Sequence, residues 1–344
     1  MVFMGHFITS NSKLGPILPV MFSQYWSGVD LFFVISGFVI FLSLYRLRAA
    51  ASGSWEFSVA YSSFRFWRIV PIYLLLIASF LLIPMFYRPP AESNPFASSI
   101  PHWCYFIFAQ SVWAVVYQHR GADFVNVTWS LCAEVGFYGV AFLVVLLFPA
   151  RARIRILLAL VAVSYLARVA FVFIRNDLAA AYIFPACRMD GFMLGGIAAI
   201  LYVEKRLTAR FRKMLNWILV GLTPIYCLLA YLCQLQSTMF SVFFSYTFYA
   251  LFYCLLVIWA SFGEKAPLER GPLAYFGKVS YFVYLFQVPA LWLTEIFFPG
   301  ALGRFVGTLF LVVGLASLSW FCFERPLIRF GRSLLGTRIG GIPT

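Results

Sequence analysis

The side chains in this sequence that are best suited to chemistry lie inside long apolar stretches or at their ends. They are His6, Asp30, Glu134, Arg168, Arg188, Asp190 and Glu295. Ionisable groups at membrane depth are costly and usually face the interior of a helix bundle or a wet cavity. A neutral imidazole can take the proton of a hydroxyl group near pH 7, and a carboxylate beside it can stabilise the imidazolium. The pattern therefore indicates a polar site in an apolar setting.

These residues also have a purely structural interpretation. The four candidates from Glu134 to Asp190 can form ion pairs that fix the register of the helices, and Glu295 can reach water from near a helix end. His6 can be an ordinary histidine of the membrane interface. Both interpretations stay open, although titratable groups on six predicted helices favour a common layer.

The composition is that of an integral membrane protein. Of the 344 residues, 63% are hydrophobic and 11% are charged, whereas an average soluble domain is about 25% charged. The apolar runs are long and do not alternate with polar residues, which predicts helices. The predicted fold class is therefore all-α, a polytopic integral membrane bundle of about ten transmembrane helices.

The apolar runs predict ten spans, with boundaries good to a few residues. They are 1–9, 29–45, 66–87, 128–149, 154–174, 182–203, 214–235, 243–262, 275–297 and 302–323. Nine residues cannot cross a bilayer, so we expect the first helix to lack its front part, or the chain to start upstream of Met1. The apolar piece at 100–116 is interpreted as re-entrant or interfacial. One membrane domain is predicted over residues 1–330, followed by a cytoplasmic tail at 331–344.

Lysine and arginine residues predict the orientation of these spans. Nineteen of the 26 basic residues fall on one side of the membrane and five on the other, loop by loop. The richer side is cytoplasmic by the positive-inside rule, so both chain ends are predicted in the cytoplasm and the protein in the plasma (inner) membrane. The same distribution explains the net charge of +14 as an orientation signal and argues against a nucleic-acid partner.

With this orientation, the titratable groups lie in the outer part of their spans, at a rise of about 1.5 Å per residue. Pairing between arginines and carboxylates across the bundle is expected, because an unpaired charge at this depth is costly. Glu134 shares a helix face with Ser130 and Tyr138. Gly191 and Gly195 would let another helix approach closely.

A second polar group lies at the predicted cytoplasmic face, in the segment FRFWRIVP at 64–71. Arg65 and Arg68 are three residues apart and point the same way on a helix. Two guanidinium groups at a membrane surface suit a polyphosphate. The alternative is that both arginines are positive-inside anchors.

The other reactive side chains are interpreted as structural. His102 and His119 fall in the loop at 88–127, where a solvated surface position is expected. The seven cysteines show no CxxC pairing and lie mostly in apolar runs. They are therefore expected to be small packing residues and not metal ligands or disulfides.

Five segments in register resemble the membrane-bound acyltransferase-3 family, which acylates cell-surface glycans and related acceptors. They are GVDLFFVISGFVI at 28–40, FRFWRIVPIY at 64–73, TWSLCAEVGFY at 128–138, RMDGFMLGG at 188–196 and GKVSYFVYLFQVPA at 277–290, followed by FERP at 323–326. Together they cover nearly the whole chain in order.

The resemblance implies transfer of an acyl group, often acetyl, from acyl-coenzyme A on the cytoplasmic side. It also implies a histidine near the end of the first helix, and His6 in VFMGHF matches that position. The family usually has an arginine about ten residues before that histidine, which would precede Met1. Gln287 stands where the family often has a histidine, which reflects either acceptor choice or simple variation.

The residues and the resemblance agree on one mechanism. His6 would be the general base or carry the acyl group transiently, and Glu134 or Asp30 would orient its ring. The phosphates of coenzyme A would bind Arg65 and Arg68. The acceptor site would be formed by Arg168, Arg188 and Asp190.

The sequence thus predicts an O-acyltransferase that acts on a cell-surface or lipid-linked glycan. No metal and no bound cofactor are expected, since acetyl-CoA or another acyl-CoA is a co-substrate. The partners are the glycan acceptor and membrane lipid. The alternative is a transporter or flippase of lipid-linked glycans, which would use the same charged layer without acyl chemistry.

Overall fold

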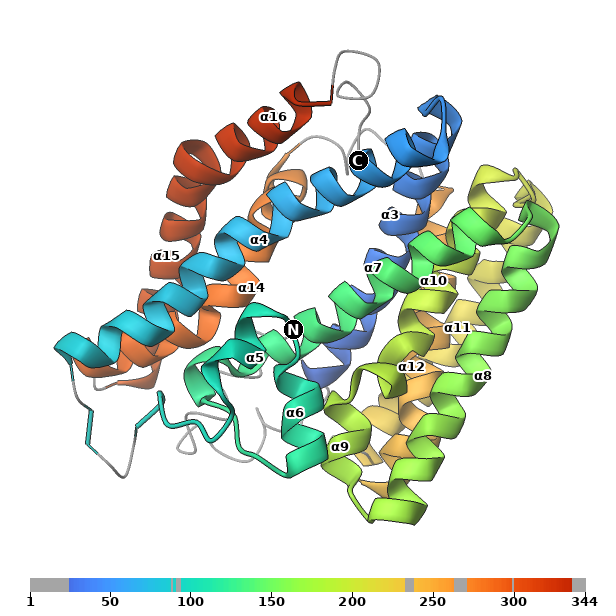
Figure 1. Ribbon diagram of the computed structural model, residues 1–344. Helices are drawn as coiled ribbons and strands as arrows, with labels where there is room; N and C mark the ends of the chain where they lie inside the picture. The colour runs from blue at the N-terminus through green and yellow to red at the C-terminus, as the bar shows by residue number, and fades with distance from the viewer. Residues whose placement is uncertain are drawn as a thin grey trace. The chain divides into compact units, whose positions relative to one another are not determined.

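The computed structural model describes residues 25–87, 89–90, 94–232, 238–262, 271–298 and 300–335. These residues form two compact units, which are described separately below. The helices are labelled in Figure 1. The part of the chain described here contains helices and no strands. Nine of its helices are long and apolar enough to cross a membrane. The all-α prediction and nine of the ten predicted spans are therefore confirmed, while the span at 1–9, with His6, lies outside the described residues.

The first unit takes its described residues from Met1–Arg46 and Ser130–Glu264. Its helices, in chain order, are η1 (Tyr25–Ser27), α3 (Gly28–Ala50), α7 (Trp129–Leu147), α8 (Ala150–Arg175), α9 (Leu178–Ile183), η4 (Pro185–Arg188), α10 (Met189–Val203), α11 (Ala209–Leu232), the π-helical turn η5 (Ser241–Ser245) and α12 (Tyr246–Ser261). Both α8 and α12 pack against α10, and α11 packs against α12.

Small residues bring α3 and α10 into backbone contact. A Cβ atom at Gly195 would overlap the carbonyl oxygen of Val34, and one at Gly37 would overlap the carbonyl oxygen of Phe192. Glycine is therefore required at both positions, as the sequence predicts for Gly195. Beside this contact, the ring of Phe192 stacks between Phe33 at 4.4 Å and Phe137 at 4.6 Å, which adds α7 to the same core.

The second unit takes its described residues from Leu47–Trp129 and Lys265–Pro343. Its helices are α4 (Ser54–Phe86), α5 (His102–Phe106), α6 (Gln110–Tyr117), η3 (Asp123–Thr128), α14 (Pro272–Phe297), α15 (Ala301–Ser319), the π-helical turn η6 (Trp320–Glu324) and α16 (Arg325–Ser333). Helices α14 and α15 pack against each other, and α4 and η3 both pack against α14. In the region predicted as re-entrant or interfacial, α5 and α6 have five and eight residues, too few to cross a bilayer.

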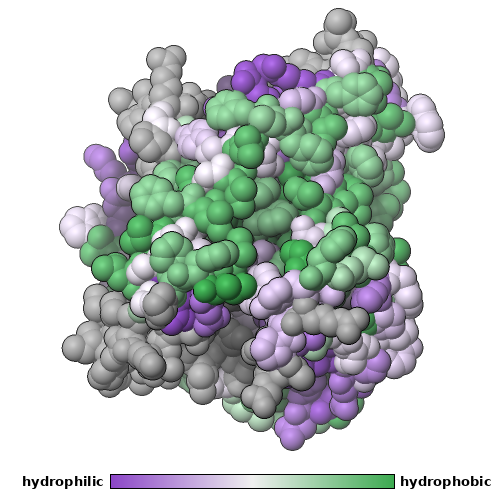
Figure 2. Space-filling model, turned by 90° about the vertical axis from the view of Figure 1, so that its left-hand side faces the viewer, coloured by the Kyte–Doolittle hydropathy of each residue, from purple (hydrophilic) through white to green (hydrophobic). Residues whose placement is uncertain are grey.

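Large apolar side chains face outward on several of these helices. On α15, Phe310 is 76% exposed and Leu318 is 60% exposed. Figure 2 shows hydrophobic residues over most of the middle of one face, with hydrophilic residues toward its upper and lower margins. Such a surface is unfavourable in water and suits contact with lipid, which agrees with a multi-pass membrane protein.

The prediction of one membrane domain at 1–330 with a tail at 331–344 stays a prediction. Helix α16 continues from α15 through η6 and ends at Ser333, so this helix runs across the predicted boundary at residue 330. The tail beyond residue 335 lies outside the described residues.

Candidate functional site

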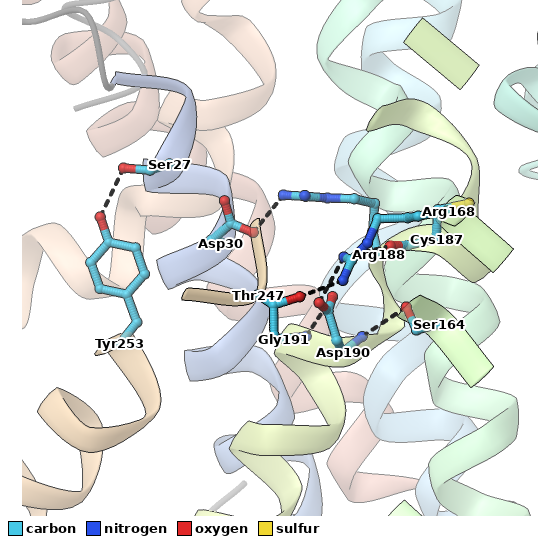
Figure 3. A network of polar contacts seen from close by, with 10 residues as sticks. All are labelled: Ser27, Asp30, Ser164, Arg168, Cys187, Arg188, Asp190, Gly191, Thr247 and Tyr253. Carbon is cyan, nitrogen blue, oxygen red and sulfur yellow. Dashed lines mark hydrogen bonds and ion pairs between the residues drawn. The ribbon is translucent and has the colours of Figure 1, made fainter. Parts of the chain in front are cut away.

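Two buried ion pairs form the polar centre of the first unit (Figure 3). Arg188 Nη2 donates to Asp30 Oδ1 at 2.5 Å, and Arg168 Nη1 donates to Asp190 Oδ2 at 2.7 Å. All four side chains are at most 2% exposed. The predicted pairing of arginines with carboxylates is thus confirmed, with partners on α3, α8, η4 and α10.

Local sequence explains how these charges reach the centre. Pro185 cannot continue α9, and Phe184 before it is extended, with φ −73° and ψ 126°. This is the conformation that a following proline favours. The short η4 turn then carries Arg188 to the start of α10, with Asp190 in its first turn. Asp30 likewise lies in the first turn of α3, where a helix N-terminus stabilises a carboxylate.

The Arg168–Asp190 pair is held by several further hydrogen bonds. Arg168 also donates to the carbonyl oxygen of Cys187 at 3.0 Å and to Thr247 Oγ1 at 2.6 Å. The second carboxylate oxygen of Asp190 accepts from the backbone N–H of Gly191 at 3.0 Å. These bonds tie α8, α10 and α12 together, so this pair acts as a clamp that fixes the site.

The Arg188–Asp30 pair makes fewer hydrogen bonds than the Arg168–Asp190 pair. Arg188 Nη1 and Nε and Asp30 Oδ2 have no hydrogen-bond partner among the described residues. An unsatisfied buried polar group costs about 1–3 kcal/mol. Two nitrogen atoms of Arg188 and one oxygen atom of Asp30 are thus left without a hydrogen bond in the part of the chain that the structure describes.

Aromatic rings enclose Arg188. Its guanidinium carbon lies 4.3 Å from the ring centre of Tyr246, 5.2 Å from that of Tyr182 and 5.8 Å from that of Phe33. Trp26 packs edge-on against Tyr246 at 5.4 Å. Cation–π contacts of this kind stabilise a desolvated arginine by up to about 2 kcal/mol, which helps to keep Arg188 charged in an apolar setting.

A cluster of hydroxyl groups lies one helical turn before Asp30. Ser27 Oγ lies 2.9 Å from the hydroxyl oxygen of Tyr253 and 3.3 Å from that of Tyr226, and the two tyrosine hydroxyls are 2.9 Å apart. Ser27 and Asp30 share a helix face because they are three residues apart. The site therefore combines a charged pair, aromatic faces and hydroxyl groups, a combination that suits a ligand with several hydroxyl groups.

Glu134 has a different partner. It is buried on α7, and its Oε1 accepts a hydrogen bond from Tyr138 at 2.7 Å. The predicted shared face of Glu134 and Tyr138 is thus confirmed as a contact. The two ion pairs themselves are made by Asp30 and Asp190.

The second unit holds the other predicted site residues. Arg65 and Arg68 lie in α4, with Arg65 over the ring of Tyr61 at 5.7 Å and Arg68 exposed. Gln287 is buried on α14 at 1% exposure. Glu295, near the end of the same helix, accepts a hydrogen bond from Arg304 at 3.0 Å.

The histidines and cysteines expected to be structural behave so in part: of the six described cysteines, four are buried, and Cys227 and Cys322 are exposed. His102 is exposed, and His119 is partly exposed and accepts a hydrogen bond from Trp113 at 3.2 Å. Cys104 is fully buried on α5, outside the membrane-spanning helices. Burial raises the pKa of its thiol, so the group stays protonated at neutral pH, as a packing residue should.

Sequence reasoning missed the aromatic enclosure and the hydroxyl cluster. Trp26 and Tyr182 precede Asp30 and Arg188 by four and six positions, which is a weak local signal. Tyr246 and Thr247 are far from both in sequence, and nothing in their spacing points to the site. Only the packing of α12 on α10 brings them there.

A comparison with protein families matches residues 1–324 to the family model described as an acyltransferase domain. The chain belongs to the acyltransferase-3 family. This acyltransferase is a multi-pass membrane enzyme, and its family membership favours O-acyl transfer over a transporter of lipid-linked glycans. Neither the curated proteins nor the solved structures compared with the chain gave a match.

Proposed function

We propose that this acyltransferase moves an acyl group, most simply acetyl, from acyl-coenzyme A to a hydroxyl group of a cell-surface or lipid-linked glycan. In this reaction the acceptor oxygen attacks the thioester carbonyl carbon, so that a C–O bond forms and the C–S bond breaks. The proton of the hydroxyl group ends on the coenzyme A thiolate. The products are a glycan ester and free coenzyme A.

The observation that carries this proposal is the buried Arg188–Asp30 pair, which has polar atoms without a hydrogen-bond partner among the described residues, in an acyltransferase of this family. Arg188 offers N–H donors and Asp30 offers a carboxylate oxygen, which match the acceptor and donor atoms of sugar hydroxyl groups. The rings of Tyr246 and Tyr182 lie beside them and hold the Arg188 guanidinium in place through cation–π contacts. The clamp of Arg168 and Asp190 shapes this acceptor site.

His6 supplies the proton transfer in this proposal. As general base it takes the hydroxyl proton of the acceptor and returns it to the leaving thiolate, or it carries the acyl group between donor and acceptor. Asp30 or Glu134 orients its ring and stabilises the imidazolium. His6 lies outside the described residues, so this role rests on its residue type, its place in the sequence and the family.

The acyl donor is proposed to bind in the second unit. Arg65 and Arg68 lie on one side of α4, and a guanidinium group binds phosphate through two parallel N–H bonds. The charge distribution in the sequence puts these arginines on the cytoplasmic side of the plasma (inner) membrane. The C-terminus lies on the same side in this proposal.

Binding of coenzyme A to variants of the purified protein tests the donor assignment. We expect Arg65→Ala and Arg68→Ala each to weaken the binding of a non-hydrolysable acyl-CoA analogue by about 1.5–3 kcal/mol. Lysine at either position should restore binding only in part, because its ammonium group cannot form the two parallel N–H bonds of a guanidinium group. Wild-type affinity in both correctly inserted alanine variants would show that these arginines are only topological anchors.

A further inference from the structure

Three arginines form a line along α16 in the second unit. Arg325, Arg329 and Arg332 are spaced at i, i+4 and i+7, which places them along one side of a helix. Arg325 and Arg329 are exposed and Arg332 is half-buried. The helix has the sequence RPLIRFGRS and carries no acidic residue that would offset these charges.

This arginine line lies against the part of α4 that carries Arg68. Phe330 packs edge-on against Trp67 at 5.3 Å, and the guanidinium carbon of Arg332 lies 5.8 Å from the ring centre of Phe64. Phe64 and Arg68 are four residues apart and so share a face of α4. The three arginines of α16 and the exposed Arg68 therefore belong to one basic surface.

The acid that adjoins this surface is held inward. Glu324 is 4% exposed and accepts a hydrogen bond from Ser319 at 3.0 Å. It is close enough to Arg68 for their charges to interact. Glu324 alone can offset at most one of the four arginine charges.

The lengths of α4 and α15 place the basic surface about one bilayer thickness from the other end of the second unit. At the opposite end of the unit, Tyr87 packs edge-on against Trp292 at 5.6 Å. From Arg68 to the end of α4 at Phe86 the helix rises about 27 Å, and from Ala301 to Arg325 about 36 Å. These lengths bracket the hydrocarbon thickness of about 30 Å, so the arginines reach the polar region of one leaflet.

We propose that Arg325, Arg329 and Arg332 join Arg68 in one polyphosphate site that binds the phosphates of the acyl-CoA donor. Coenzyme A carries a pyrophosphate and a separate 3′-phosphate, more anionic oxygens than two arginines can satisfy with bidentate bonds. The α16 arginines supply the missing donors. This inference rests on the proposed function, in which α4 binds the donor, and adds α16 as the second wall of that site.

The phosphate of an anionic lipid could bind these arginines in the same way. The experiment therefore separates binding of coenzyme A from binding of a lipid headgroup. Coenzyme A binding is measured by calorimetry on the full chain in a neutral detergent without anionic lipid. It is repeated in nanodiscs with and without phosphatidylglycerol. The variants are R329Q, the triple variant R325Q/R329Q/R332Q, and a control, R210Q/R212Q/K213Q, that removes three exposed positive charges from α11.

In neutral detergent, we expect the triple α16 variant to raise the Kd for coenzyme A at least tenfold and R329Q to raise it severalfold. The α11 control should bind like wild type. R329Q changes one exposed side chain and keeps the test valid if the triple variant misfolds. Raising the salt concentration should weaken wild-type binding more than binding by the triple variant.

Three results would overturn the inference. If Arg65→Ala and Arg68→Ala weaken binding but the α16 variants do not, the donor site stands without α16. The same conclusion follows if the α16 variants change binding only in nanodiscs with phosphatidylglycerol, because the arginines then serve a lipid headgroup. If the wild-type chain does not bind coenzyme A at all, the proposed donor site fails together with this inference.

Discussion

Arg188 and Asp30 are 158 residues apart in sequence and form a buried ion pair at 2.5 Å that uses only one donor and one acceptor. The neighbouring Arg168–Asp190 pair differs, since it also bonds to the backbone and to Thr247. This contrast divides the predicted acceptor residues into a pair with spare bonding capacity and a clamp that holds the site. Each part makes its own prediction.

Changes in the first pair should impair transfer as well as folding, because Asp30→Asn also leaves a buried arginine without its counter-charge. Asp30→Asn keeps an oxygen atom for Arg188 but removes the carboxylate charge. Arg188→Lys keeps the positive charge but loses the planar guanidinium group. We expect both to raise the acceptor KM about tenfold or more, as for the loss of a hydrogen bond to a charged group. Steady-state kinetics with varied acceptor at saturating acyl-CoA would measure this. An unchanged KM in both variants would exclude an acceptor role for the pair.

Changes in the clamp should impair folding first. Asp190→Asn leaves the buried Arg168 without its counter-charge, which costs roughly 3–5 kcal/mol in comparable buried pairs. Unfolding of the purified protein in mixed micelles would measure the loss. The matched control is Asp123→Asn, because Asp123 forms an exposed pair with Arg120 at 3.5 Å, and such pairs contribute little. Equal stability of the two variants would contradict the clamp.

The contact between α3 and α10 gives a steric prediction. Gly195→Ala would drive a Cβ into the carbonyl oxygen of Val34, whereas Gly139→Ala on α7 meets no atom within 4 Å. Overpacking a close contact costs typically about 1–3 kcal/mol, and an unobstructed Gly→Ala change in a helix is neutral or stabilising. Thermal unfolding of both variants checks this. Gly195→Ala should be the less stable of the two variants, and equal stability would contradict the close contact between α3 and α10.

The predicted orientation can be tested with single cysteines. Ala97 lies in the loop before α5 and Thr208 just before α11, and both are exposed. With Cys227 and Cys322 replaced, because both are exposed, Ala97→Cys should react with an impermeant thiol reagent in intact cells and Thr208→Cys should not. Reaction of Thr208→Cys alone would reverse the topology.

Hydrophobic pattern predicted most of the fold because span length and apolar content are local properties of the sequence. The span predicted at 66–87 belongs to a helix that begins at Ser54, since residues 54–65 are too polar for a span but still form a helix. The span predicted at 182–203 is interrupted before Pro185. That break separates α9 from α10 and carries Arg188 into the site.

The candidate site could be predicted only as a set of residue types. Burial in an apolar setting requires each arginine to find a carboxylate, so pairing was predictable. The choice of partners was not, because Asp30 meets Arg188 only through the packing of α3 on α10. Tyr246 escaped prediction for the same reason, since its ring contacts Arg188 from a helix that follows much later in the chain.

Transfer of labelled acetyl from acetyl-CoA to a glycan acceptor, compared between wild type and His6→Ala, tests the central claim most directly. His102→Ala and His119→Ala are matched controls, because each removes one imidazole that lies outside the predicted membrane spans. We predict that His6→Ala lowers the transfer rate roughly 10²–10⁴-fold, the usual contribution of general acid–base catalysis, with coenzyme A affinity unchanged. Both controls should transfer at the wild-type rate. Wild-type transfer by a correctly folded His6→Ala variant would contradict the mechanism.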